Sequence, residues 1–148
     1  MAKILSVNIS EGGIPKRPVP QCVVTVSGLE GDGHDHDKHN SPDRAVSLMD
    51  NEILLQLIEE GYTLCPGAIG ENLTVEDLHV QTLEPGDRLS FSGGVEIELV
   101  EARKPCFVLD PLGESLKKEI VGRSGYLARV ITEGTFEPGE SITVKNPT

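Results

Sequence analysis

The stretch Val95-Glu-Ile-Glu-Leu-Val-Glu-Ala-Arg-Lys-Pro-Cys106 joins a strand pattern to a candidate reactive cysteine. Apolar Val95, Ile97 and Leu99 alternate with glutamates, which is the period-two pattern of a half-buried strand. Pro105 has no N–H to donate to a sheet, so we expect the strand to end there. The sequence therefore predicts a strand over residues 95–101 that ends close to Cys106.

Cys106 directly follows two cations and a proline. Positive charges close to a thiol favour the thiolate, which is the nucleophilic and metal-binding form of cysteine. Arg103 and Lys104 would supply this charge. The alternative, a small buried apolar cysteine, stays open at this point.

The same alternation recurs in short segments along the whole chain. Strands are predicted over 3–9, 21–26, 73–75, 88–91, 95–101, 126–132 and 141–145, with a short apolar run over 45–48. A helix is predicted from Asp50, as its cap, to about residue 60, with an apolar stripe of Ile53, Leu54, Leu57 and Ile58. A second short helix is predicted near 112–120, and the Gly/Pro-rich stretches 11–20 and 133–139 are expected to be loops or turns. Many short strands with two short helices favour a mainly β fold, a sandwich or a barrel.

The totals restrict the function classes. At 148 residues the chain is expected to be a single domain, 1–148. A net charge of −11 disfavours binding to a nucleic-acid backbone, and 3% aromatic residues disfavour base stacking. No apolar segment predicts a signal peptide or a membrane span. Three cysteines without a Cys-x-x-Cys pair argue against a disulfide framework and favour a reducing, cytoplasmic location.

A long polar segment, 27–44, contains two further candidate groups. His34, His36 and His39, together with aspartates including Asp32, could bind zinc, iron or manganese, but their spacing does not fit a calcium loop. The alternative is a solvated polar loop. The guanidinium of Arg44 suits a phosphate or carboxylate and Asp43 could orient it, unless the two form a surface ion pair.

The glycine-punctuated stretch Pro66–Asn72 is a candidate ligand loop. Backbone amides freed by glycines can bind anions, and Glu71 and Asn72 could hydrogen-bond a ligand or another loop. Most Pro-Gly loops are only turns. In this acidic chain Arg123 and Arg129 join Arg103, Lys104 and Arg44 as candidate contacts to an anionic ligand, with a surface ion pair as the alternative for each.

Six motifs in order are similar to those of the MOSC domain, the C-terminal domain of molybdenum cofactor sulfurases. The resemblance extends from about Lys3 to Val144. The motifs are Gly28-Leu-Glu-Gly-Asp-Gly-His34, Asp43-Arg-Ala-Val-Ser-Leu48 with Glu52, Pro66-Gly-Ala-Ile-Gly-Glu-Asn-Leu73, Pro85-Gly-Asp87, Arg103-Lys-Pro-Cys106 and Gly125-Tyr-Leu-Ala-Arg-Val130.

The resemblance implies a β-barrel-like fold, often standing alone in bacteria, that binds the molybdenum cofactor (molybdopterin). It also implies that Cys106 either carries sulfur as a persulfide or ligates molybdenum. The residues expected to bind this cofactor, with the cations at its phosphate and pterin, are His34, Asp43, Arg44, Glu71, Asn72, Arg103, Lys104, Arg123 and Arg129. Related sulfurases make their sulfur in a separate pyridoxal-phosphate domain. We expect no pyridoxal phosphate here, and a cysteine desulfurase or a molybdoenzyme as partner, with no nucleic acid and no membrane.

Two other functions stay open. The chain could be a molybdenum-dependent reductase of N-hydroxylated compounds that takes electrons from another protein, because three cysteines cannot hold a four-cysteine cluster. It could instead be a metal-binding protein or metal-dependent hydrolase built on His34, His36 and His39. Whether it is an enzyme, of a sulfurtransferase or an oxidoreductase type, is not decided by the sequence.

Overall fold

The computed structural model describes residues 2–10, 16–32, 45–103, 123 and 125–145. Within these ranges the fold is mainly β, as predicted, with one α-helix and one 3-10 helix. In chain order the elements are β1 (Lys3–Ile9), β2 (Arg17–Val19), β3 (Cys22–Thr25), β4 (Gly28–Leu29), β5 (Val46–Asp50), α1 (Asn51–Glu59), β6 (Leu73–Glu76), η3 (Val80–Thr82), β7 (Arg88–Phe91), β8 (Glu96–Ala102), β9 (Tyr126–Thr132), β10 (Gly134–Phe136) and β11 (Ile142–Lys145).

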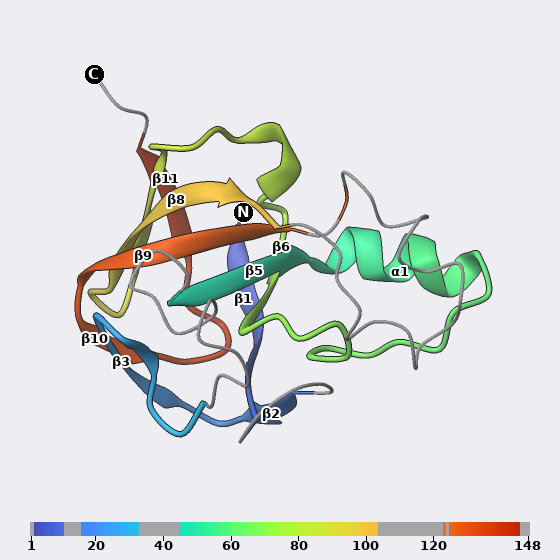
Figure 1. The fold of residues 1–148 in the computed structure, drawn as a ribbon, viewed down its shortest axis with the longest axis horizontal. Helices are drawn as coiled ribbons and strands as arrows, with labels where there is room; N and C mark the ends of the chain where they lie inside the picture. Colours follow the sequence, from blue (N-terminus) through green and yellow to red (C-terminus); the bar gives the residue numbers. More distant parts are fainter. Residues whose placement is uncertain (1, 11–15, 33–44, 104–122, 124, 146–148) are drawn as a thin grey trace.

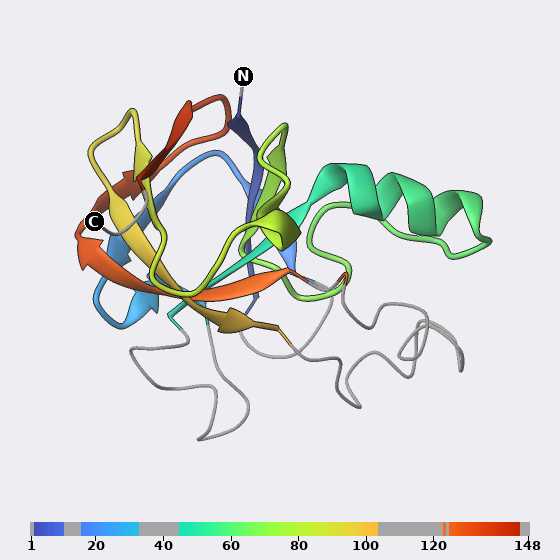
Figure 2. The ribbon, with the colours of Figure 1, turned by 90° about the horizontal axis from the view of Figure 1, so that it is seen from above.

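Eight strands form one sheet in the order β11-β7-β8-β9-β5-β6-β1-β2, and β10-β3-β4 form a second sheet. Only the β5–β6 pair is parallel among the pairs within the described ranges. The large sheet curls until the start of β1 meets the chain entering β11, where the N–H of Ile4 donates to the Glu140 carbonyl at 2.9 Å. Seen from above, the strands surround a common interior and α1 projects to one side (Figure 2). The arrangement is therefore barrel-like.

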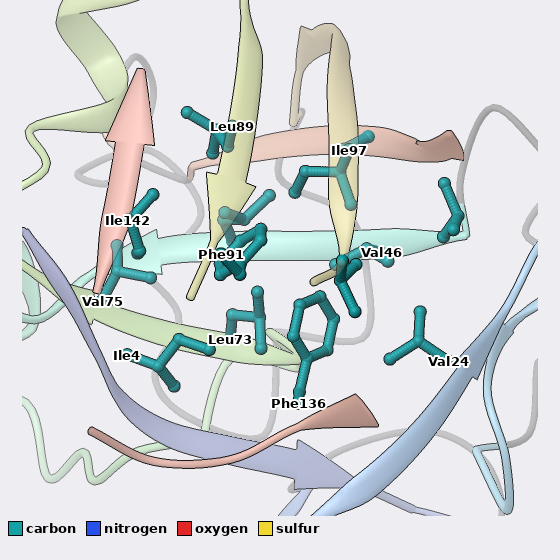
Figure 3. Packing of buried hydrophobic residues seen from close by; sticks show 14 of the residues in the cluster. Ile4, Val24, Val46, Leu73, Val75, Leu89, Phe91, Ile97, Phe136 and Ile142 are labelled. Carbon is teal, nitrogen blue, oxygen red and sulfur yellow. The ribbon is translucent and has the colours of Figure 1, made fainter. Parts of the chain in front are cut away.

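Apolar side chains from both sheets fill this interior. The T-shaped pair Phe91 and Phe136, with ring centroids 4.8 Å apart, lies among Ile4, Leu73 and Ile97 (Figure 3). The alternation predicted for residues 95–101 is confirmed over its first part. Ile97 and Leu99 are buried, while Glu96 and Glu98, which alternate with them, are only partly buried. Burial of this cluster is the main force that holds the two sheets together.

Helix α1 lies outside the curled sheet (Figure 1) and packs through a smaller apolar cluster. The predicted stripe was wrong in part, because Leu54 and Leu57 are buried but Ile58 is 41% exposed. Asp50 occupies the N-cap position, yet its side chain does not cap the helix. Instead Asp50 Oδ1 accepts a hydrogen bond at 3.0 Å from the N–H of Val80, and so ties α1 to η3.

Two predicted connections contain strands. β2 lies in the Pro-rich stretch 11–20, where Pro18 pairs opposite Asn8 at the edge of the large sheet. An edge strand tolerates proline because one side needs no ladder bonds. β10 lies in the predicted turn 133–139 and carries fully buried Phe136. The helix predicted near 112–120 lies outside the described residues.

Candidate functional site

The predicted site residues divide into two groups. Glu71, Asn72, Arg103, Arg123 and Arg129 are described. The remaining ones lie outside the described residues, namely His34, His36, His39, Asp43, Arg44, Lys104 and Cys106. The site is therefore built from the first group and from the described chain that flanks the second.

The 65–72 loop, Cys65–Asn72, connects the chain after α1 to β6 and is held from two sides (Figure 1). The N–H of Lys16 donates to the Gly67 carbonyl at 2.8 Å, and the N–H of Asn8 donates to the Asn72 carbonyl at 2.7 Å. Gly67 has φ +89°, and a Cβ there would lie 2.8 Å from the Lys16 carbonyl carbon. Glycine is thus required for this close approach.

Asn72 is the centre of a buried polar network. Its Oδ1 accepts from the Ser47 N–H at 3.0 Å, and its Nδ2 donates to the Asn8 carbonyl at 3.3 Å and to Asp32 Oδ2 at 2.9 Å. Because these bonds use both ends of the amide, Asn72 shapes the loop rather than presenting groups to a ligand.

Asp32 connects this network to the N-terminal loop. Its Oδ1 accepts from Lys16 Nζ at 2.6 Å and from the Ser10 N–H at 3.0 Å, and the Asp32 and Lys16 side chains are only 1% and 11% exposed. Both carboxylate oxygens of Asp32 are thus bound within the protein. This explains its burial and removes the reason to group it with the histidines as a metal ligand. Within the described part of the chain, no cluster of three or more His, Cys, Asp or Glu residues is arranged to hold a metal.

Glu71 is fully buried beside this network, and its two carboxyl oxygens have different surroundings. Oε2 accepts hydrogen bonds from the Gly67 N–H at 3.0 Å and from Thr74 Oγ1 at 2.9 Å. Oε1 is buried and has no hydrogen-bond partner among the described residues. Burial raises the pKa of Glu71, and hydrogen bonds and the positive charge of Arg103 oppose this shift.

Arg103 follows β8 and reaches the 65–72 loop. Its Nη2 donates to the Ile69 carbonyl at 2.7 Å, and its backbone N–H donates to the Gly125 carbonyl at 2.9 Å. The Gly125 N–H in turn donates to Gln81 Oε1. The two described ends of the segment that carries Lys104 and Cys106 are therefore joined, with a cation at that junction.

The flanks of both undescribed motif segments meet at the 65–72 loop. Asp32, just before the histidine-containing segment, bonds to Asn72, and Ser47, just after it, bonds to the same residue. Arg103, just before the cysteine-containing segment, bonds to Ile69. The described flanks of both segments thus contact one loop, although they are far apart in sequence.

Arg123 and Arg129 are engaged in ion pairs. Arg123 forms a two-point pair with Glu60 at the end of α1, at 2.8 and 3.2 Å, and this hydrogen-bonded cation lowers the pKa of Glu60. Arg129 Nη2 lies 2.8 Å from Glu98 on the exposed side of the β8–β9 pair. Both arginines thus form the kind of surface ion pair that the sequence analysis gave as the alternative to a ligand contact.

The other two cysteines differ in environment. Cys22 is buried in the core, as its register in the strand predicted, and burial raises the pKa of its thiol. Cys65 is exposed at the start of the 65–72 loop. Cys65 is thus a solvent-accessible thiol close to the candidate site.

Sequence reasoning missed Asn8, Ser47 and Thr74 as parts of the site. Each lies on a predicted strand or apolar run, where a polar residue could equally face solvent. The available signal was that Ser6, Asn8 and Thr74 each stand between two apolar neighbours, and all three are buried. Buried polar groups require hydrogen-bond partners, so such residues indicate a network.

The MOSC domain model matches residues 35–143. The chain therefore belongs to the MOSC domain family, as the motifs predicted. It is 34% identical over 140 residues to YflK of Bacillus subtilis, across 89% of this chain and 62% of YflK. A protein of Gibberella moniliformis named "Reductase" is 28% identical over 130 residues, across 81% of this chain and 23% of that protein. The chain thus spans less than two thirds of either curated relative.

Solved structures show the same fold. YuaD of Bacillus subtilis superposes with a TM-score of 0.81 at 19% identity, covering 99% of this chain and 97% of that one. YiiM of Geobacillus stearothermophilus gives a TM-score of 0.81 at 27% identity, covering 99% and 76%. These likenesses support a β-barrel-like MOSC fold. Among the helices of the described ranges, none is both long and apolar enough to cross a membrane.

Proposed function

We propose that this MOSC protein binds the molybdenum cofactor or carries sulfur to it, and that Cys106 is the reactive thiol. The observation that carries the proposal is the fixed position of Arg103, which precedes Lys104-Pro-Cys106 and is anchored to Ile69 and Gly125. In a chain of net charge −11, a cation held at this junction favours a thiolate and an anionic ligand close by.

The described residues fit such a ligand in charge and in hydrogen-bonding capacity. Arg103 offers positive charge, and Glu71 Oε1 is a buried polar atom without a hydrogen-bond partner in the described part of the chain. Arg103, with Lys104 and Arg44, would hold the phosphate end; Glu71 would contact a polar group of the ligand, and Cys106 would be the metal ligand or sulfur carrier. When bound, the cofactor would supply a redox-active metal. The role of Asn72 is to shape the loop.

In the sulfur-carrier form, the donor is the persulfide of a cysteine desulfurase. The Cys106 thiolate attacks the terminal sulfur of that persulfide. The sulfur–sulfur bond of the donor breaks as a new one forms on Cys106, and the donor cysteine leaves as its thiolate. The transfer needs no added oxidant or reductant, because one persulfide replaces another.

Incubation with a cysteine desulfurase and cysteine tests this step. Intact-mass spectrometry is expected to show an adduct of about 32 Da, one sulfur atom, on the wild type and none on Cys106→Ala. Cys65→Ala is the matched control, because Cys65 is an exposed thiol on the neighbouring loop and its removal is expected to leave loading unchanged. Loading that follows Cys65 instead would contradict the assignment.

A second candidate function is suggested by the fungal relative named "Reductase". In that form the chain, loaded with the cofactor, would reduce an N-hydroxylated compound: the N–O bond breaks, and two electrons from an external donor and two protons yield the N–H product and water. Turnover of an amidoxime with a reduced dye, lost in Cys106→Ala, is the expected result. If the loaded protein accepts sulfur but does not turn over the amidoxime, the reductase function is contradicted and the sulfur-carrier function is retained.

A further inference from the structure

The two oxygens of the Glu71 carboxyl have different hydrogen-bond environments. Oε2 accepts from a backbone N–H and from the Thr74 hydroxyl, so its position and acceptor role are fixed. Oε1 has no donor aimed at it among the described residues, although the side chain is 0% exposed. A negative charge shared with an oxygen that receives no hydrogen bond is costly in a buried site. The arrangement therefore suits a neutral carboxylic acid with its hydroxyl at Oε1.

The surroundings of Glu71 favour an acceptor as the partner of that hydroxyl. The charged group that acts on Glu71 is Arg103, directly after β8. The carboxyl is also acted on by the Gly67 N–H of the loop, by the backbone N–H of Glu71 itself and by Thr74 on β6. The Asn8 amide of β1 donates to the Glu71 carbonyl at 3.2 Å. Nearby, the Lys16–Asp32 ion pair lies beyond Asn72. The positive charge of Arg103 that acts on Glu71 would favour an electronegative oxygen over a ligand donor as that partner.

We propose that the neutral Glu71 hydroxyl and the charge of Arg103 together form a donor site for a tetrahedral oxyanion. The inference deepens the proposed function, since it takes the phosphate end of the cofactor as the natural oxyanion. An oxyanion at Oε1 would lie out of water, where hydrogen bonds and charge interactions are stronger than on the surface.

The proposal has a defined dependence on pH. The folded, ligand-bound protein holds the Glu71 proton, so ionisation of Glu71 at higher pH replaces a donor with a second negative charge. Oxyanion affinity is therefore expected to fall as pH rises through the pKa of Glu71, which burial raises above its ordinary value. The fall in affinity is expected to be at most about tenfold per pH unit.

Sulfate is the probe, because its charge does not change across this pH range, and chloride at equal ionic strength is the reference. Titration calorimetry on the full chain is expected to show sulfate binding to the wild type. Glu71→Gln can accept with its oxygen at the Oε2 position and donate with its amide at the Oε1 position. This variant is expected to bind within about threefold of wild type and to lose the fall in affinity at high pH. Glu71→Met, which has similar length and no donor, is expected to lose at least about tenfold.

Glu52→Gln is the matched control. Glu52 also has a buried Oε1 without a partner among the described residues and an Oε2 bound by a backbone N–H, that of Asp77. Its replacement is expected to leave sulfate affinity unchanged. Should Glu71→Met fail to fold, Arg103→Gln replaces it as the variant expected to lose at least about tenfold.

Three results would overturn the proposal: no sulfate binding to the wild type, an equal loss in Glu71→Gln and Glu71→Met, or an equal effect of Glu52→Gln. A wild type that binds no sulfate could still be loaded with sulfur or molybdenum at Cys106. Failure of this inference and failure of the proposed function are therefore distinguishable.

Discussion

Replacing Gly125 by alanine tests whether the junction at the base of the cysteine-containing segment is as tight as the structure shows. Gly125 has φ +89°, and a Cβ there would overlap the Leu48 carbonyl oxygen and lie 2.9 Å from its carbon. The left-handed backbone costs an alanine about 1–2 kcal/mol. Losing the bond between the Arg103 N–H and the Gly125 carbonyl adds about 0.5–1.5 kcal/mol. The free energy of unfolding is therefore expected to fall by about 2.5 kcal/mol, the midpoint of the sum of these two terms.

Gly139→Ala is the matched control, because Gly139 has φ +94° and open space where its Cβ would lie. It is expected to cost only the backbone strain, about 1–2 kcal/mol. Urea unfolding of both variants, followed by far-ultraviolet circular dichroism, measures the difference. If Gly125→Ala and Gly139→Ala agree within about 0.5 kcal/mol, the reasoning from close contact is refuted.

Three further predictions concern the polar groups around the site. Because burial raises the pKa of Glu71, the folded state binds its proton more tightly than the unfolded chain; this stability is fully present below the ordinary pKa and is lost as pH rises to the folded pKa. Glu71→Gln should therefore gain stability relative to wild type with rising pH in urea unfolding, and a constant difference would contradict this. Asn72→Ala removes hydrogen bonds to Ser47 and Asp32 and should lower the free energy of unfolding by about 3 kcal/mol, whereas a loss below about 1 kcal/mol would show that the network is dispensable. Arg123→Gln should return the pKa of Glu60 to its ordinary range in an NMR titration without moving the unfolding midpoint, and an unmoved Glu60 pKa would exclude the ion pair in solution.

Local pattern was sufficient for the bounds of several elements. Lys3–Ile9 is a strand with the predicted bounds, and α1 begins directly after Asp50. The burial of Lys3–Ile9 does not follow the predicted alternation, because Leu5 is exposed while Ser6, Val7 and Asn8 are all buried, next to a register shift in the pairing with β6. Pattern failed where tertiary contacts override local preference. β2 forms in a proline-rich stretch because it needs hydrogen bonds on one side only, and Asp50 bonds to Val80, which no spacing along α1 reveals.

The site divides in the same way. Glu71 and Asn72 were found because their glycine-rich motif stands out in the sequence. Their roles differ, since Asn72 has both ends of its amide bound within the protein while Glu71 keeps one oxygen without a partner among the described residues. Asn8 and Asp32 belong to the site because they hydrogen-bond to the 65–72 loop, which is far from them in sequence. Periodicity does not encode such contacts. Arg123 and Arg129 were chosen for their charge and their place in the motif segments, and neither feature separates a ligand contact from a surface ion pair.

The most direct test of the central claim is the elemental content and intact mass of the protein from a host that makes molybdenum cofactor. Wild type is compared with Cys106→Ala and with the triple alanine variant of His34, His36 and His39. The account predicts molybdenum, or an adduct of about 32 Da, in the wild type and the histidine variant and neither in Cys106→Ala. Zinc or iron bound in stoichiometric amount, retained in Cys106→Ala and lost in the histidine variant, would contradict it and place the chemistry in the histidine-containing segment.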